Sequence, residues 1–468
     1  MNRRPLALLA AGSLLAAAPL ALAAPRSKPV SFRRVVLADQ KAYGEPSLAL
    51  SADGKHIAVC VPGGAGETSV WFSGNDGKTF GTSHTNSANG GGDCEIDFLP
   101  NGTLINADLE VSDSAIRYSK DFGKTWKGSQ TAGIEQDRQW FAHSKDGTKE
   151  YLVYHDFVAE GEFFAESDDG GLTWPTNLAA QPVNGIDQVA LPGIGAGTPG
   201  TPASIVDQGV NTFSGPMLIS PDGKETYVLY SISDAKSNLT TPSSPAYGPT
   251  RGIVVAHKGP ESTSFTNDYA VANDGASTSG AIFPWGAIDK AGTVYVFYNS
   301  DKGARPGHYH TYYVFSKDKA KTWSKPIKVD DVPLNSGAQV YATGAAGAPG
   351  VIDIAWYGHK GPGTNDGLAN VWDVQFAQVR HADTTHPQIT RAAVAPNDPI
   401  HHGSISLGGL IGQLEGGDRS LLDFFELAIG TDGMAQIAYA DNFGDFEDGK
   451  KGHVIWAKQQ TGRSAWER

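Results

Sequence analysis

The sequence has 468 residues and a formal net charge of −13, with 50 acidic residues against 37 lysines and arginines. An acidic surface of this kind disfavours nucleic acid and anionic membranes, so neither is an expected partner. The chain contains 57 glycines and 27 prolines, and no long stretch keeps a helical period, which favours many short strands over long helices.

The first 23 residues have the pattern of an export signal. Arg3 and Arg4 precede an apolar run of alanine and leucine that ends at Ala21-Leu22-Ala23. A basic start, a short apolar segment and small residues before a cleavage site are typical of secretory signals, and the paired arginines leave a twin-arginine route open. We therefore expect a secreted or periplasmic protein with one domain over residues 24–468. No second apolar run is long enough to span a bilayer.

Seven times along the chain, an apolar strand, a turn and a second apolar strand follow one another. In the first copy, residues 46–50 lead through Asp53-Gly54 to residues 57–59. Asp-Gly or Asn-Gly between apolar runs indicates a β-hairpin. The further copies begin near residues 94, 139, 216, 283, 341 and 422.

A second repeat, eight residues long, follows four other apolar runs. The clearest copy runs from Ser167 to Trp174, with a serine, an acidic residue, a glycine, a threonine and an aromatic residue in fixed order. Serine and aspartate oxygens accept hydrogen bonds from nearby backbone N–H groups, and glycine adopts conformations that other residues resist, so each copy is expected to be a turn. The residues expected to hold these turns are Ser73, Asp76, Ser119, Asp121, Ser167, Asp169, Ser316 and Asp318.

This eight-residue frame resembles the Asp box, or BNR repeat, of bacterial sialidases and related secreted propellers. The copies at Ser73, Ser119 and Ser167 are 46 and 48 residues apart, the size of a blade with an inner and an outer hairpin. The resemblance implies an all-β fold, a single β-propeller of four-stranded antiparallel blades. Seven blades follow from the inner hairpins, with six, as in sialidases, as the alternative. The last unit supplies only three strands, so residues 30–37 are expected to complete it and close the ring.

Ligands of propellers bind where the innermost strands begin and where loops join the second and third strands. Charged residues at these positions include Asp93. Since a guanidinium fork matches the carboxylate of an acidic sugar, the candidate substrate-binding residues are Arg138, Arg305 and Arg419. The candidate catalytic residues, chosen by their place in the repeat, are Asp137, Asp156, Tyr357 and Asp441. The alternative for Arg138 and Arg419 is a salt bridge between neighbouring blades.

The resemblance implies an exported glycoside hydrolase, sialidase-like, that acts on a glycan or glycoconjugate at the central channel. Sialidases hold the substrate carboxylate with three arginines, the first of which sits in a Phe/Tyr-Arg-Ile-Pro motif that is absent here. A non-catalytic propeller that binds a glycan or a protein is therefore the alternative function. The sequence makes no prediction of an oligomeric state.

The remaining candidates concern metals and cysteines. No cofactor is expected, although the acidic loop 441–448 has oxygen ligands of the kind that calcium takes. Two histidine pairs, at His308 and His310 and at His401 and His402, lack a third metal ligand in the sequence. Cys60 and Cys94 are the only cysteines, and in an exported protein they are expected to form a disulfide, with two free thiols as the alternative.

Overall fold

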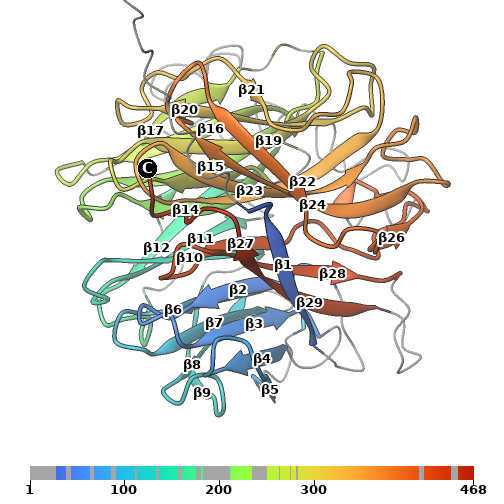
Figure 1. The fold of residues 1–468 in the computed structure, drawn as a ribbon. Helices are drawn as coiled ribbons and strands as arrows, with labels where there is room; N and C mark the ends of the chain where they lie inside the picture. Colours follow the sequence, from blue (N-terminus) through green and yellow to red (C-terminus); the bar gives the residue numbers. More distant parts are fainter. Residues whose placement is uncertain are drawn as a thin grey trace, which may run out of the picture.

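The computed structural model describes residues 28–468 except for 38–43, 64–67, 86–90, 111–112, 133–135, 157–160, 175–180, 183–210, 234–249, 263, 273, 275, 281–282, 410–415 and 444–451. The described elements are all β-strands, arranged as seven antiparallel sheets around one axis (Figure 1). The chain is a seven-bladed β-propeller, which confirms the prediction from the inner hairpins. Within these residues, no helix has the length and apolar character needed to cross a membrane.

Each of the first six blades uses consecutive strands, with the first strand of a blade closest to the axis. The first three blades contain β2 (Ser47–Leu50), β3 (Ile57–Val61), β4 (Ser69–Ser73) and β5 (Gly81–His84), then β6 (Cys94–Phe98), β7 (Leu104–Leu109), β8 (Ser114–Ser119) and β9 (Lys127–Ala132), then β10 (Gln136–His143), β11 (Glu150–Asp156), β12 (Gly161–Ser167) and β13 (Gln181–Pro182). The next two contain β14 (Asn211–Ile219), β15 (Thr226–Ser233), β16 (Thr250–Lys258) and β17 (Thr266–Val271), then β18 (Trp285–Ile288), β19 (Val294–Ser300), β20 (His310–Ser316) and β21 (Ile327–Lys328).

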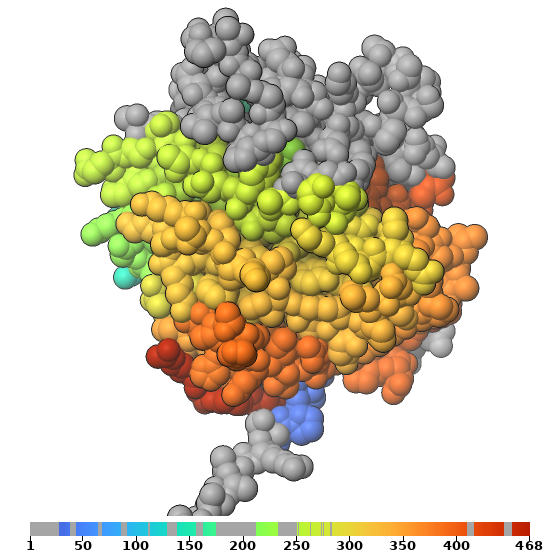
Figure 2. Space-filling view, turned by 90° about the horizontal axis from the view of Figure 1, so that it is seen from above, coloured from blue at the N-terminus to red at the C-terminus, as the bar shows by residue number. Residues whose placement is uncertain are grey.

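The sixth blade has one strand more than the others, because a two-residue strand pairs with its third strand. Its strands are β22 (Ala338–Ala346), β23 (Val351–His359), β24 (Val371–Arg380), β25 (Gln388–Ala393) and the extra β26 (His401–His402). In Figure 2, turned by 90°, the yellow and orange fifth and sixth blades lie side by side on the outer surface. Two segments rich in glycine, proline and serine, 181–211 and 233–250, lie mostly outside the described residues.

The seventh blade combines the two ends of the chain. Its strands are β27 (Glu426–Ile429), β28 (Ala435–Asp441), β29 (His453–Thr461) and β1 (Ser31–Leu37). The N-terminal strand pairs antiparallel with β29, from Ser31 opposite Thr461 to Leu37 opposite Val454, and Figure 1 shows the two side by side. The predicted ring closure is therefore confirmed, and it satisfies backbone groups that an open ring would expose.

The four repeated turns share one set of hydrogen bonds. The serine hydroxyl accepts from the backbone N–H four residues on, at 2.8–3.0 Å, in the copies that start at Ser73, Ser119, Ser167 and Ser316. In the last three copies the aspartate carboxylate accepts from the threonine N–H at 2.8–2.9 Å. In the first copy this role belongs to Asn75, not to Asp76, whose carboxylate instead forms an ion pair with Lys458 at 2.6 Å.

The glycine of the repeated turn is needed because the turn rests on the neighbouring blade. Gly77 has a φ of 66°, and a Cβ atom there would lie 2.2 Å from the indole ring of Trp456 in the seventh blade. Gly171 has a φ of 82°, and its Cβ would lie 2.1 Å from Ile105 in the second blade. The repeated motif therefore does two things: it closes a hairpin and it leaves room for a side chain from the next blade.

We expect Gly77→Ala to lower the free energy of unfolding by about 3 kcal/mol, because a left-handed backbone and a steric clash both oppose a methyl group. Gly223→Ala is the matched control, since Gly223 has a φ of 74° but no atom within 4 Å of the added Cβ. The control should lose only about 1–2 kcal/mol, the backbone cost alone. Chemical denaturation of both variants measures the difference, and equal losses would contradict the packing role of Gly77.

Candidate functional site

Four non-glycine residues at the start of innermost strands have a left-handed backbone: Glu45, Arg138, Tyr341 and Leu422, with φ between 52° and 57°. At Arg138 and Tyr341 the strand register shifts, so both residues lie in bulges. Such bulges re-aim side chains, and left-handed non-glycine residues cluster at functional sites, at a cost of about 1–3 kcal/mol each. The starts of the innermost strands are therefore the first place to look for a site.

The group that we call the rim cluster consists of Glu45, Asp93, Tyr341, Arg419 and Asp423, which come from the first, second, sixth and seventh blades. The Arg419 guanidinium binds the Asp423 carboxylate through two nitrogens and lies 3.6 Å from Glu45. The backbone N–H of Asp423 donates to Glu45 Oε1 at 3.0 Å. Asp93 is a third carboxyl group close enough to Glu45 to act on its charge. Three carboxyl groups and one guanidinium thus meet where four blades converge.

Glu45 is the buried acid of this cluster, with 2% of its surface exposed. Burial, together with the Asp93 and Asp423 carboxylates, raises the pKa of Glu45 well above its usual range. Burial also raises the pKa of Asp423, although Arg419 opposes that shift. Asp93 is only partly buried. Three neighbouring carboxyl groups cannot all be ionised at low cost beside one guanidinium, so the neutral form of the buried Glu45 is favoured.

Tyr341 brings a hydroxyl group to the same place. Its Oη donates to the backbone carbonyl of Ser406 at 2.9 Å and lies 3.4 Å from Asp423 Oδ1. Burial and the Asp423 carboxylate raise the pKa of Tyr341 well above its usual range. The rim cluster therefore contains a phenol beside the Asp423 carboxylate, together with the buried Glu45, whose neutral form is favoured.

A second charged layer lies beneath the rim cluster. Arg138 is fully buried and donates to Glu95 Oε2 at 2.7 Å, while Glu426 lies 3.8 Å away. Ser47 donates to Glu95 at 3.2 Å, and the backbone N–H of Leu48 donates to Glu426 at 2.6 Å. Burial raises the pKa of Glu95 to about 7 despite Arg138. Arg138 therefore joins the third blade to carboxyl groups of the second and seventh blades.

Aromatic rings enclose the same guanidinium. Its central carbon lies 3.7 Å from the centre of the Trp140 ring and 4.2 Å from that of Phe424. Trp140 also packs edge-on against Trp285 of the fifth blade, with ring centres 5.2 Å apart. These rings from opposite sides of the propeller meet at the axis, so Arg138 is held by cation–π contacts as well as by carboxylates.

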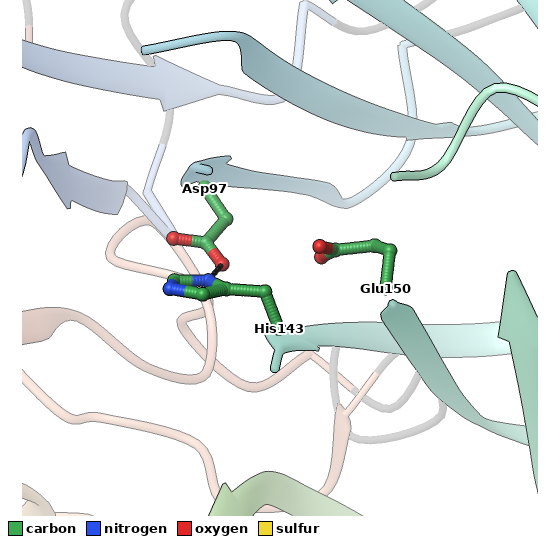
Figure 3. Close-up of side chains that lie close together, drawn as sticks. All are labelled: Asp97, His143 and Glu150. Atoms are coloured by element: carbon green, nitrogen blue, oxygen red, sulfur yellow. Dashed lines mark hydrogen bonds and ion pairs between the residues drawn. The ribbon is translucent and has the colours of Figure 1, made fainter. Parts of the chain in front are cut away.

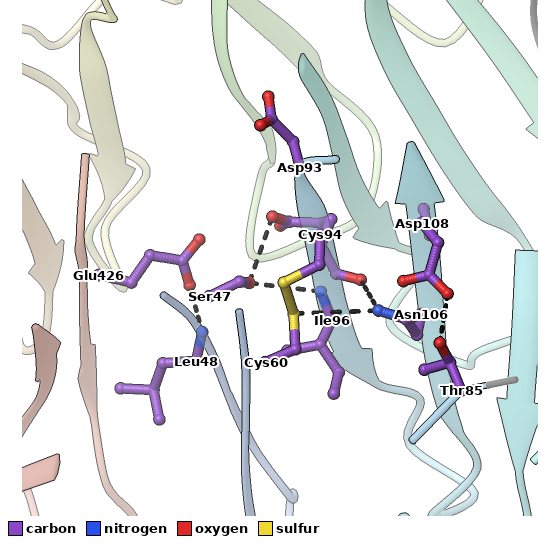
Figure 4. Close-up of a disulfide and its surroundings, with 12 residues drawn as sticks. Ser47, Leu48, Cys60, Thr85, Asp93, Cys94, Ile96, Asn106, Asp108 and Glu426 are labelled. Carbon is purple, nitrogen blue, oxygen red and sulfur yellow. Dashed lines mark hydrogen bonds between the residues drawn. A yellow bond between two sulfur atoms is a disulfide. The ribbon is translucent and has the colours of Figure 1, made fainter. Parts of the chain in front are cut away.

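A disulfide fixes the acids of the second blade. Cys60 of β3 is bonded to Cys94, the first residue of β6, and Asp93 and Glu95 flank Cys94 in the sequence. Figure 4 shows the Asp93 side chain pointing away from the disulfide, and Ser47 and Glu426 on the side of the first blade. The disulfide therefore anchors the short segment that carries one carboxyl group to the rim cluster and another to the Arg138 layer.

The residues chosen from the sequence are spread over several environments. Arg419 belongs to the rim cluster, Arg138 is enclosed beneath it, and Arg305 is exposed and contacts Asn335. The structure does not bring these three arginines together. The contacts of Arg138 are those of the alternative prediction, a salt bridge between blades. The disulfide and seven of the eight turn residues occupy the expected places, Asp76 being the exception.

Of the candidate catalytic residues, Tyr357 packs edge-on against Tyr341 of the rim cluster, with ring centres 6.0 Å apart, and the others lie outside that cluster or are described only in part. Tyr357 is fully buried, stacks on Phe425 with ring centres 4.3 Å apart and accepts a hydrogen bond from the backbone of Ala440. Asp441 is buried and accepts from the Phe443 N–H at 3.0 Å. The backbones of Asp137 and Asp156 lie at one end of the first hairpin of the third blade, and their side chains lie outside the described part.

The metal candidates from the sequence have other partners. His310 binds Asp330 at 3.0 Å, His308 binds the Gly337 carbonyl at 3.0 Å, and His401 binds Asn442 at 2.9 Å. Residues 444–448 of the acidic loop lie outside the described residues. Two hollows, of about 160 Å³ and 200 Å³, are lined by residues that do not belong to the rim cluster.

Sequence reasoning missed Glu45, Tyr341 and Asp423. A usable signal was present, because Glu45, Asp93 and Asp423 each precede an innermost strand by one to three residues. Tyr341 carried no such signal, because only the bulge in β22 turns it toward Asp423.

Comparisons with known proteins show the fold. No profile of a known protein family matches the chain, and no curated protein matches its sequence. Similar solved structures include a PL25 ulvan lyase bound to -[GlcA(1-4)Rha3S]-, with 11% identity, a TM-score of 0.51, and coverage of 90% of this chain and 95% of that one. The polysaccharide lyase Uly1 has 10% identity, a TM-score of 0.50 and 90% coverage of both chains. NanB sialidase from Streptococcus pneumoniae has 8% identity, a TM-score of 0.43, and coverage of 93% and 71%. At these identities the likeness shows the fold alone.

We expect Arg138→Met to lower the free energy of unfolding by about 3–5 kcal/mol, because it leaves two buried carboxyl groups without their cation. Arg305→Met is the matched control, since Arg305 is exposed, and its effect should stay within about 0.5 kcal/mol. Urea titration followed by tryptophan fluorescence compares the two variants. A stable Arg138→Met protein would instead favour a role in ligand binding.

Proposed function

We propose that this protein is a glycan-active enzyme and that the rim cluster carries out acid–base chemistry on a glycosidic bond. The observation that carries the proposal is Glu45, a carboxyl group with 2% of its surface exposed, whose pKa is raised well above its usual range by burial and by the neighbouring Asp93 and Asp423. A carboxyl group that holds its proton at neutral pH can act as a general acid. The likeness to solved glycan-active propellers agrees with this function at the level of fold.

We assign Glu45 and Asp93 a single role, donation of one proton to the leaving-group oxygen, with the more exposed Asp93 nearer to the substrate. Tyr341, whose hydroxyl lies 3.4 Å from Asp423, supplies a neutral hydrogen-bond donor at the same place, because its pKa is raised well above its usual range.

The contacts of the arginines indicate which sugars the site can bind. Two nitrogens of Arg419 already bind Asp423, and Arg138 is fully buried, so these two arginines do not form an open receptor for a substrate carboxylate. Sialic acid is thus one substrate to test among several. Residues 1–23 have the pattern of an export signal, so we also propose that the enzyme is exported. The solved ulvan lyase is described with a uronic acid and a sulfated rhamnose, which is a reason to include polyuronides in the test.

We expect the purified protein to turn over at least one member of a panel of fluorogenic glycosides, a sialoside and polyuronides, and Glu45→Gln to lower kcat/KM on that substrate about 10²–10⁴-fold. Glu225→Gln is the control, because Glu225 binds His257 and Lys319 away from the rim cluster. Reducing-sugar release distinguishes hydrolysis from elimination, which creates an ultraviolet-absorbing double bond. Full activity of Glu45→Gln would refute the assignment. A panel without turnover would favour a non-catalytic propeller, and glycan-array binding would then identify its ligand.

The rate should also depend on pH in a defined direction. The pKa of Glu45 lies well above its usual range, so the acid is present at low pH and is lost as the pH rises through that value. We expect kcat/KM to fall on the alkaline side while the protein stays folded by circular dichroism. Asp353→Asn is the control, because Asp353 is another buried carboxyl group, with a pKa of about 7, that lies outside the cluster. An alkaline limb that disappears in this control would contradict the role of Glu45.

A further inference from the structure

A second group of ionisable side chains lies at the opposite ends of the strands, where hairpin turns join the first and second strands. It consists of Asp97 from β6, His143 at the end of β10 and Glu150 at the start of β11. One ligand atom from each residue lies within 4.8 Å of the other two (Figure 3). The group therefore bridges the second and third blades and is separate from the rim cluster.

Glu150 is the member of this group whose buried charge has no hydrogen-bond partner among the described residues. Its side chain is fully buried, and neither carboxylate oxygen has a hydrogen-bond partner among the described residues. Glu162, another fully buried glutamate of this blade, accepts hydrogen bonds from Thr212 and His155. A buried carboxylate without a partner is costly unless a proton or a cation neutralises it. Figure 3 shows the Glu150 carboxylate pointing toward the other two side chains.

Asp97 and His143 supply the remaining donors and an access route. Asp97 Oδ2 lies 2.6 Å from His143 Nδ1, and the two side chains are 26% and 30% exposed, so an ion can reach the group from solvent. An imidazole nitrogen with two carboxylates suits zinc and similar first-row ions, whereas calcium prefers oxygen ligands alone.

We propose that Asp97, His143 and Glu150 bind one divalent transition-metal ion, zinc or an ion of similar chemistry, between the second and third blades. The ion would take one oxygen from each carboxylate and one ring nitrogen, and water would complete the coordination on the exposed side. It would neutralise Glu150 and join the two blades opposite the rim cluster. This site is independent of the proposed catalytic function.

Isothermal titration calorimetry of the untagged, chelator-treated protein with zinc chloride tests the site. The wild type should bind one zinc ion that Glu150→Gln and Asp97→Asn bind at least tenfold more weakly, and saturating zinc should raise the melting temperature of the wild type but not of these two variants. His257→Gln is the matched control, because His257 also binds a carboxylate, that of Glu225 at 2.6 Å, outside this group. The control should bind zinc like the wild type.

Three outcomes would overturn the proposal: no saturable zinc binding to the wild type, wild-type affinity in both ligand variants, or loss of the site in the control. Glu150→Gln also distinguishes whether a metal ion or a proton neutralises the Glu150 carboxylate. If a proton neutralises Glu150, the isosteric amide should leave both zinc binding and melting temperature unchanged. If circular dichroism shows that one of the two ligand variants, Glu150→Gln or Asp97→Asn, does not fold, the zinc affinity of the other variant tests the proposal. The visible absorption of bound cobalt, lost in the same variants, gives a second readout.

Discussion

Burial of charge at the propeller axis is the constraint on which the rest of the structure depends. Arg138 sits where three blades meet, and its guanidinium is shared by Glu95 and Glu426 and covered by aromatic rings. Removal of charges from water costs free energy that only close, well-oriented partners offset. The innermost strands must therefore hold these partners in fixed positions, and the left-handed backbone of Arg138 is part of that arrangement.

The same constraint shapes the rim cluster above this layer. Carboxyl groups outnumber guanidinium groups there, since Glu45, Asp93 and Asp423 face the single cation of Arg419. Burial and the neighbouring carboxyl groups therefore favour the neutral form of Glu45. A carboxyl group whose neutral form is favoured is the condition that acid catalysis requires.

The outer part of the ring obeys a different constraint, the fit of one blade against the next. In three of the four repeated turns a glycine has a close neighbour in another blade, as Gly77 has in Trp456, and the fourth turn has Ala320 at this position. Ring closure adds to this fit, because Arg33 of the N-terminal strand donates to the backbone carbonyls of Asp76 and Gly77 in the first blade. The repeats thus determine how blades pack, while the site depends on residues that do not repeat.

The sequence by itself determined the architecture of this protein. Hairpin signals and turn residues act over a few positions, so the seven inner hairpins, the four repeated turns and the strand that closes the ring could be predicted from local patterns. One turn residue was predicted wrongly: the sequence analysis chose the acidic Asp76, whereas Asn75 stands at the position that aspartate holds in the other copies and accepts the hydrogen bond from Thr79.

Only the tertiary structure decided which side chains meet. Glu45 and Asp423 are 378 residues apart and come together through ring closure, and Tyr341 faces them because β22 bulges. Arg138 and Arg419 occupy equivalent places in the repeat, yet one is enclosed by aromatic rings and the other faces the rim cluster. Contacts across the axis join several blades at once, and the distances and desolvation that set their pKa values have no counterpart in any local run of residues.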